Sequence, residues 1–381
     1  MQTINHAYNE TSLFIEKYFS QKLSVSALET IAEESSTEYD TFNKYIKEDL
    51  ELQEDNTEQE EIKGVELPTK ELQNETPLKV VSFDGVGVPM IKKEAAKIKA
   101  RNGRGEKRQK KKEALIGVEY DVEKKERKAE EIAQRMIYPE NEKKEKNPEK
   151  GKNIHPQKKK YIASIAKCKR EVMGVFYDRI KNKDFTINPL ICLIDGAKSL
   201  INAFKDEFKR IANKVMILDI IHFIEYIWPI AHIKYKEGSN EAKAYVYEKL
   251  LMILKGNVCV YIKELEDGFH QNRLKTCHKK IYQKVITYLR NHQMYMHYND
   301  YLSKGYPIGT GVIESACSHV VKQRTEIAGA RWGIDGAESI LKLRSVKQSN
   351  EWDAYWDFYT DKREDNNIID IKTIRQYKLV A

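Results

Sequence analysis

The chain has 381 residues, of which 66 are Lys or Arg and 58 are Asp or Glu, and its formal net charge at pH 7 is +8. Apolar runs such as Val215–Ile221 stop far short of the ~20 residues of a membrane-spanning helix. The first ten residues have no signal-peptide pattern, and five cysteines without a CxxC pair indicate reduced thiols. These features exclude secreted, disulfide-stapled and membrane proteins and favour a cytoplasmic, globular one.

The charge is unevenly distributed. Residues 1–75 carry 18 acidic and 6 basic side chains, a net of −12, and residues 76–381 therefore carry +20. The densest basic part is 91–160, with 24 Lys or Arg against 13 acids. A basic body attracts polyanions, of which nucleic acid is the commonest in a cell, although a solvated Lys-rich surface is the plain alternative. Four residues here are candidates for contacts with a DNA backbone: Arg101, Arg104, Lys107 and Arg108.

Residues 11–50 have apolar side chains at helical spacing, with Ser24 and Thr37 as expected N-caps. Three such helices could form a helix-turn-helix. The third carries several acids that phosphates would repel, and this favours a helical packing module. Residues 51–77 are acidic and rich in Gln and Asn, which is typical of a linker.

The character changes at residue 78. Leu78–Phe83 is an apolar, β-branched run that predicts a buried strand ending at Asp84, and Ala114–Tyr120 predicts a second strand. Charged residues with three prolines predict a solvated loop over 139–160, followed by a helix over Tyr161–Lys181.

Two further apolar runs, Pro189–Ile194 and Lys214–Asp219, are separated by a segment of helical length. This βαβ pattern predicts a parallel sheet. From Ile220 to about Lys304 the helical period dominates.

Asp84 and Asp195 each follow an apolar run and precede a glycine. Ligands of open α/β sheets bind beyond the carboxyl ends of the strands, and two carboxylates there repel unless a cation such as Mg²⁺ lies between them. The alternative is that each Asp-Gly pair only makes a turn. Glu314 is expected in the first turn of a helix that starts near Val312, where a carboxylate suits the helix dipole. Lys322 and Arg324, further along, suit phosphate.

Six segments together resemble one family. They are VVSFDGVGVPM (80–90), LIDGA (193–197), ILDIIHFIEY (217–226), GYPIGTGVIESACSHVVKQR (305–324), AGARWG with GA (328–333 and 336–337) and EWDAYW (351–356). This set resembles insertion-sequence transposases of the ISKra type over roughly residues 78–358, and the segment around Glu314 is the most specific match.

The resemblance implies an α/β, ribonuclease-H-like mixed sheet with flanking helices, interrupted by an all-α insertion. It implies an Asp-Asp-Glu triad of Asp84, Asp195 and Glu314 that holds Mg²⁺, with Mn²⁺ as a substitute, for metal-dependent cleavage and strand transfer at insertion-sequence ends. The implied partners are transposon-end and target DNA and further copies of the chain on paired ends, at the nucleoid of a prokaryotic cell. Alternatives are a stand-alone nuclease of the same fold and a decayed, DNA-binding transposon remnant.

The expected organisation is an N-terminal helical segment (1–50), a linker (51–77), the first part of the catalytic core (78–219), a helical insertion (220–304), the rest of the core (305–358) and a tail (359–381). The sequence departs from the family where Lys198 follows the second Asp-Gly-Ala instead of an aromatic residue. It also has no N-terminal zinc-ribbon cysteines.

Other residues allow alternatives. Asp219 and His222, near the same sheet edge, could orient DNA or a water near the metals, or His222 could simply be a buried residue at a helix start. Trp228 and the segment Tyr295–Tyr301 could stack on bases, although core packing is favoured. The neighbours His270, Cys277 and His278 lack a second pair at zinc-ligand spacing. Neither a GxSxG elbow nor a Walker A motif is present.

Overall fold

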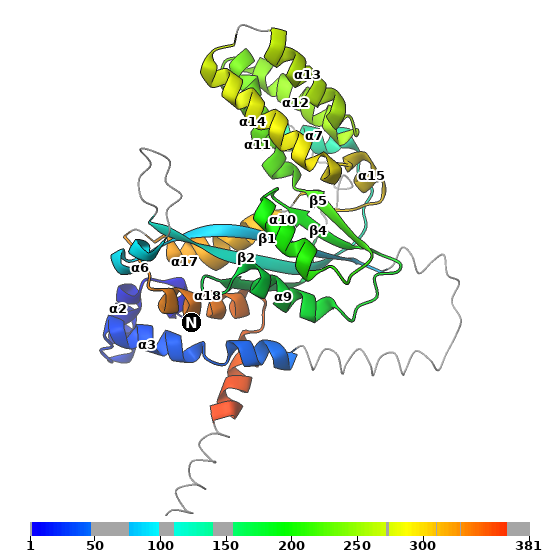
Figure 1. Cartoon of the computed structure of the whole chain (residues 1–381). Helices are drawn as coiled ribbons and strands as arrows, with labels where there is room; N and C mark the ends of the chain where they lie inside the picture. The colour runs from blue at the N-terminus through cyan, green and yellow to red at the C-terminus, as the bar shows by residue number, and fades with distance from the viewer. Residues whose placement is uncertain are drawn as a thin grey trace, which may run out of the picture.

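The computed structural model describes residues 2–46, 76–98, 110–139, 155–271, 274–309, 311–327 and 329–363. Its sheet consists of β1 (Leu78–Pro89), β2 (Lys111–Val122), β3 (Gln157–Ser164), β4 (Leu190–Ile194) and β5 (Lys214–Leu218). The strand order is β3-β2-β1-β4-β5; β1, β4 and β5 are parallel, and β2 is antiparallel to β1 and β3. The α/β class with a mixed sheet is thus confirmed (Figure 1).

The parallel half of the sheet follows the predicted βαβ pattern. β4 and β5 pair in parallel, and helix α10 (Lys198–Glu207) connects them. All five residues of β4 are buried. Strands covered on both faces are continuously apolar, as this one is. Phe83 of β1 packs edge-on against Phe176 of α9 (Lys169–Ile180), so the helices close one face with an aromatic cluster.

Three sequence predictions need correction. The strand predicted for Leu78–Phe83 continues to Pro89, because β1 pairs with β2 over its whole length. Asp84 therefore lies within a strand and not at its end. The loop predicted for 139–160 gives way to β3 from Gln157 onward, and the helix predicted from Tyr161 begins only at Lys169. The charged residues of β3 made it look like a solvated loop in the sequence. In the fold, however, Lys160 is 3% exposed and paired with Glu351.

Helix α18 (Ile334–Gln348) covers the free edge of β3. The backbone N–H of Ala163 donates to Ser345 Oγ at 3.1 Å, and that of Tyr161 donates to Ser349 Oγ at 2.9 Å. Glu338 accepts from the backbone N–H of Ile165 at 2.8 Å. A sheet edge with unpaired backbone groups invites pairing with another chain, and these side chains prevent it.

A helical lobe stands at one end of the sheet, at the top of Figure 1. It comprises α11 (Ile220–Lys234), α12 (Asn240–Leu254), α13 (Val258–Gln271), α14 (Thr276–His292), a 3₁₀ turn (Gln293–Tyr295) and α15 (Tyr298–Ser303), with α7 (Ala129–Ile137) packed on α12. Tyr295, Tyr298 and Tyr301 are all buried, which confirms the favoured packing role. Among the described residues, no helix has the length and apolar character needed to cross a membrane.

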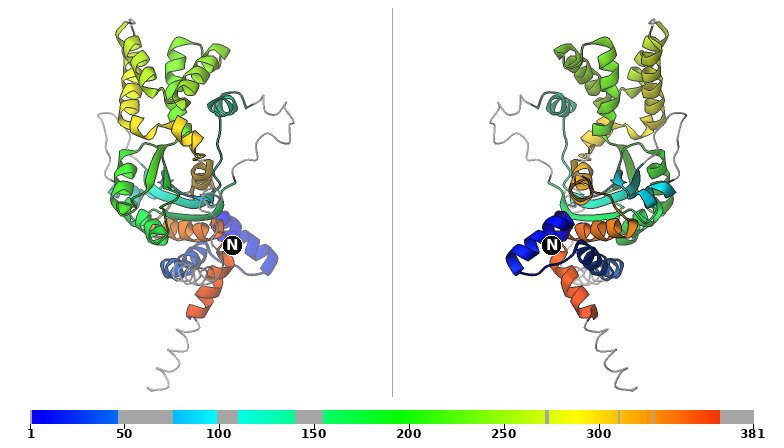
Figure 2. Two further views of the ribbon diagram at one scale, coloured as in Figure 1. Left: turned by 90° about the vertical axis from the view of Figure 1, so that its right-hand side faces the viewer. Right: turned by 90° about the vertical axis from the view of Figure 1, so that its left-hand side faces the viewer.

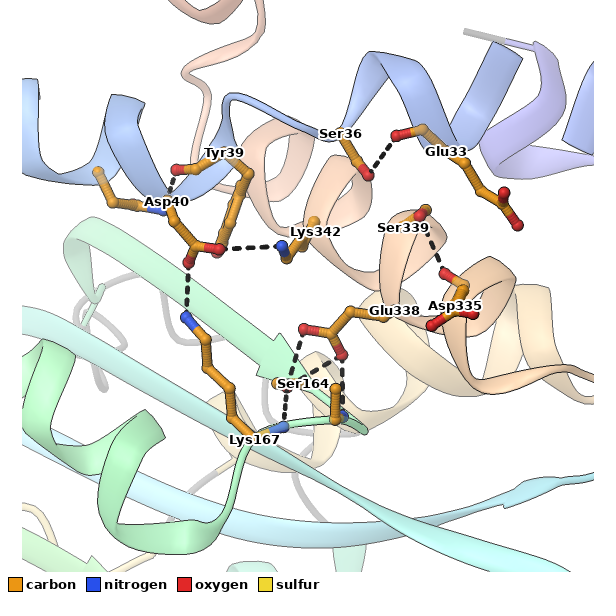
Figure 3. A network of polar contacts seen from close by, with 12 residues as sticks. Glu33, Ser36, Tyr39, Asp40, Ser164, Lys167, Asp335, Glu338, Ser339 and Lys342 are labelled. Carbon is orange, nitrogen blue, oxygen red and sulfur yellow. Dashed lines mark hydrogen bonds and ion pairs between the residues drawn. The ribbon is translucent and has the colours of Figure 1, made fainter. Parts of the chain in front are cut away.

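The N-terminal helices lie on the opposite side of the sheet from this lobe (Figure 2). They are α1 (Gln2–Asn5), α2 (Tyr8–Phe19), α3 (Val25–Ser35) and a helix over 39–46. Ser24 caps α3 as predicted, through a bond from the Ala27 N–H, but the Thr37 hydroxyl instead donates to the Glu34 carbonyl. Asp40 joins this layer to the core, because its two oxygens accept from Lys167 and Lys342 (Figure 3).

The C-terminal part of the core returns past β1, whose end is followed by α6 (Lys92–Lys97). Helix α16 (Gly311–Ala316) continues as a π-helical turn (Cys317–Lys322) and α17 (Gln323–Thr325), and a last helix spans 352–363. A bridge between Met90 and Trp332 fixes the segment after α17 to the end of β1, since the Trp332 N–H donates to the Pro89 carbonyl at 3.0 Å.

Arg344 of α18 stabilises the π-helical turn. Its Nε donates to the Val320 carbonyl at 2.8 Å, and its guanidinium also bonds the carbonyls of His319 and Ile4. A π-helical turn interrupts the regular ladder of backbone hydrogen bonds and is frequently found at functional sites. One buried cation thus supports the helix that carries Glu314 and ties it to α1.

Candidate metal centre

Three aspartates lie level with one another across the parallel half of the sheet. Ser82 of β1 pairs with Leu193 of β4, so Asp84 and Asp195, each two residues further on, are neighbours. Ile194 pairs with Leu218 of β5, and the Asp219 N–H donates to the Ile194 carbonyl at 2.8 Å, which extends this pairing by one residue. Asp195 and Asp219 thus directly follow β4 and β5, at the edge where α/β proteins bind ligands, and Asp84 lies beside them within β1, just past the pairing of β1 with β4.

Local hydrogen bonds hold each aspartate. Asp84 Oδ1 accepts from the Gly85 N–H at 2.6 Å, Asp195 Oδ1 from the Ala197 N–H at 2.7 Å, and Asp219 Oδ1 from the Ile221 N–H at 2.8 Å. In Asp219 this bond caps α11. Asp84 Oδ2 has another neighbour, the Cys317 Sγ at 3.1 Å.

Glu314 reaches this edge from α16. The preceding turn lies close to the start of α11, since the Ile220 N–H donates to the Ile308 carbonyl at 2.9 Å. Gly309 permits this approach, because a Cβ there would lie 3.0 Å from the Ile220 side chain. As predicted, Glu314 occupies the first turn of its helix.

Glu314 lies beside His222 and Asp219. One ligand atom from each of these three residues lies within 4.8 Å of the others, and the distance from His222 Nε2 to Glu314 Oε1 is 3.9 Å. Both Glu314 oxygens and His222 Nε2 are buried without a hydrogen-bond partner in the part of the chain that the structure describes. Buried polar atoms normally have hydrogen-bond partners, so the lack of such partners leaves a place for water, a cation or another ligand.

The pKa shifts show that the carboxylates act on one another. Burial raises the pKa of Glu314 to about 7, the charge of Asp219 adds to this rise, and that of His222 opposes it. Burial likewise raises the pKa of Asp195; the Ala197 N–H opposes this rise, and the charge of Asp84 adds to it. A cation among these groups would relieve the repulsion.

Asp219, His222 and Glu314 could therefore hold a metal ion. Within the described part of the chain, no other set of three His, Cys, Asp or Glu side chains places its ligand atoms this close together. The cluster His270, Cys277 and His278 is thus not assembled as a ligand set.

Tyrosines from the helical lobe form one wall of the site. The Tyr288 hydroxyl donates to the Asp195 carbonyl at 3.1 Å, and its ring stacks on Tyr226 with centroids 3.7 Å apart. Gly196 has a φ of 89° and allows this contact, since a Cβ there would lie 2.8 Å from the Tyr288 hydroxyl oxygen.

The structure brings all three predicted carboxylates into one electrostatic group and adds Asp219 and His222, which the predicted triad omits. The expectation that Arg324 suits phosphate is wrong. Arg324 is 2% exposed, with its guanidinium between the rings of Tyr8 and Trp332. The four basic residues proposed for DNA contacts, Arg101, Arg104, Lys107 and Arg108, lie outside the described residues.

Comparison of the chain with protein-family models, curated proteins and solved structures gives no significant match. The geometry of the site therefore carries the functional argument.

Proposed function

We propose that this chain is a DNA transposase that cleaves insertion-sequence ends and joins them to target DNA by metal-dependent phosphoryl transfer. The observation that carries the proposal is the position of Asp84 beside Asp195 on adjacent parallel strands, with the charge of Asp84 acting on both Asp195 and Glu314. A mixed sheet interrupted by an all-α lobe is also the arrangement expected of the ribonuclease-H-like core of such enzymes.

Asp84, Asp195 and Glu314 would hold Mg²⁺, for which Mn²⁺ would substitute. The residues fit hard cations, since they offer carboxylate oxygens, and neither oxygen of Glu314 accepts a hydrogen bond from another described residue. Bound there, such ions supply activation of water or of a DNA 3′-OH and stabilisation of the leaving oxygen. The chain needs no nucleophilic side chain of its own. Its part is to fix the carboxylates, through the N–H groups of Gly85 and Ala197 and the helix that carries Glu314.

DNA is the proposed partner, as the net charge of +20 over residues 76–381 supports. We also propose that two or more copies of the chain act together on paired transposon ends, at the nucleoid of a prokaryotic cell.

The test is cleavage of a DNA fragment that contains the gene's own flanking ends, with Mg²⁺ or Mn²⁺. The wild type is compared with Asp195→Ala and with Asp206→Asn, a control at an exposed carboxylate paired with Arg170 on the surface. Metal-dependent cuts at the ends that Asp195→Ala loses and Asp206→Asn retains would support the proposal. Cuts without joining would favour the stand-alone nuclease, and binding without cuts would favour the decayed remnant.

A further inference from the structure

One set of side chains at this edge differs in chemistry from the proposed triad. Asp219, His222 and Glu314 combine two carboxylates with an imidazole, whereas Asp84 and Asp195 offer oxygen alone. Neither Asp84 nor Asp195 belongs to the group of mutually close ligand atoms. The edge therefore presents two different ligand environments that have Glu314 in common.

We propose that Asp219, His222 and Glu314 form a separate binding position for a divalent transition metal, of which Zn²⁺ is the probe. The inference goes beyond the proposed function, since it concerns a second kind of metal and stands on the ligand set alone.

The ligand set determines the metal class. Imidazole nitrogen favours Zn²⁺ and its transition-metal neighbours, whereas Mg²⁺ prefers oxygen and retains much of its water. A zinc site that keeps a further position open has three protein ligands, and His nitrogen and Asp or Glu oxygen are both among the ligand types that zinc takes. Of the atoms in this set, His222 Nε2 and both Glu314 oxygens have no hydrogen-bond partner among the described residues.

The fold holds the three ligands in place before any ion arrives. Asp219 is 1% exposed and fixed as the cap of α11, and His222 follows three residues later on the same helix. Glu314 comes from a different helix, and the bond from the Ile220 N–H to the Ile308 carbonyl holds the preceding turn against the start of α11. Asp219 and His222 thus belong to one helix start, and a backbone hydrogen bond holds the turn before Glu314 against it.

Because Glu314 belongs to both environments, zinc at this position would compete with the magnesium-dependent reaction. Zinc would then act as an inhibitor whose effect depends on His222. This consequence rests on the proposed function; zinc binding itself does not.

The experiment is a titration of the metal-free full chain with Zn²⁺ by calorimetry and with Co²⁺ by visible absorption, without DNA. We expect one ion per chain in addition to any bound at exposed thiols. His222→Ala should weaken its binding at least ~100-fold, because loss of residues that merely orient a ligand already costs ~10–100-fold. His232→Ala, on the exposed side of the same helix, is the matched control and should change nothing.

Cys317 supplies the decisive second control, because its thiol lies at Asp84 and could attract zinc by itself. Loss of the ion in Cys317→Ser with retention in His222→Ala would overturn the ligand set, as would a thiolate charge-transfer band with Co²⁺ that Cys317→Ser removes. Absence of a bound ion in the folded wild type would also overturn the proposal. None of these results affects the DNA-cleavage test, so the two proposals can fail separately.

Discussion

Asp84 and Cys317, 233 residues apart in the chain, meet with 3.1 Å between Oδ2 and Sγ. The thiol is buried, and burial together with the neighbouring carboxylate raises its pKa, so it remains an S–H donor to Asp84. Asp84 thus has one oxygen fixed by the Gly85 N–H and the other by Cys317. This pairing links β1 to the helix that carries Glu314.

The first prediction concerns this thiol. Cys317→Ala removes the donor and should raise the Mg²⁺ concentration needed for DNA cleavage by ~10–100-fold, the usual cost of losing a group that orients a metal ligand. Cys317→Ser keeps a donor and should stay within a few-fold of the wild type. A Mg²⁺ titration of the cleavage rate checks both variants. Equal behaviour of the two would show that the S–H bond has no positioning role.

The second prediction concerns stability and pH. Because the pKa of Glu314 is raised to about 7 in the fold, the folded protein keeps a proton that the unfolded chain releases near the ordinary value of 4.5. The stability of the metal-free protein should therefore fall as pH rises from about 4.5 to about 7. Glu314→Gln cannot ionise and should escape this loss.

Thermal unfolding in a chelator tests this directly. Glu314→Gln should melt a few degrees above the wild type at pH 8 and at about the same temperature at pH 5. A variant less stable than the wild type at pH 8 would show that ionised Glu314 is stabilised within the fold. The same substitution should abolish cleavage, so stability and activity would move in opposite directions.

The third prediction concerns the π-helical turn. Arg344→Met leaves the carbonyls of His319, Val320 and Ile4 without their buried donor and should cost about 2–4 kcal/mol in urea unfolding. Arg331→Met is the matched control, because Arg331 is exposed and bonds only its neighbour's carbonyl among the described contacts. The control should stay within about 0.5 kcal/mol of the wild type. An equal loss of unfolding free energy in both variants would contradict the proposal that Arg344 stabilises the π-helical turn.

The sequence predicted well those features that depend on local pattern. The apolar run before Asp195 and the next run before Asp219 specify two buried parallel strands, and the alignment of these acids follows from strand pairing. Glu314 could be placed in a first helical turn because two glycines precede it closely. The five cysteines are free thiols, as their spacing indicated.

Features that depend on distant partners could not be predicted. β1 runs past Asp84 to Pro89 only because β2 pairs with it, and β3 is recognisable only once Glu351 neutralises its Lys160. The burial of Arg324 between two aromatic rings depends on Tyr8, more than 300 residues away. That His222 lies beside Glu314 could not be predicted either, because local spacing does not show which residues from distant segments meet.

Strand transfer of a pre-cut transposon end into plasmid DNA tests whether Asp84, Asp195 and Glu314 form the catalytic triad. The proteins compared are the wild type and the variants Asp84→Asn, Asp195→Asn and Glu314→Gln, all at matched folded concentration with Mg²⁺. The proposed triad predicts joined products from the wild type that disappear in a chelator, and a loss of more than ~100-fold in each variant, above the cost of losing an orienting group. Joining that survives in any of the three folded variants, or that needs no divalent metal, would contradict it.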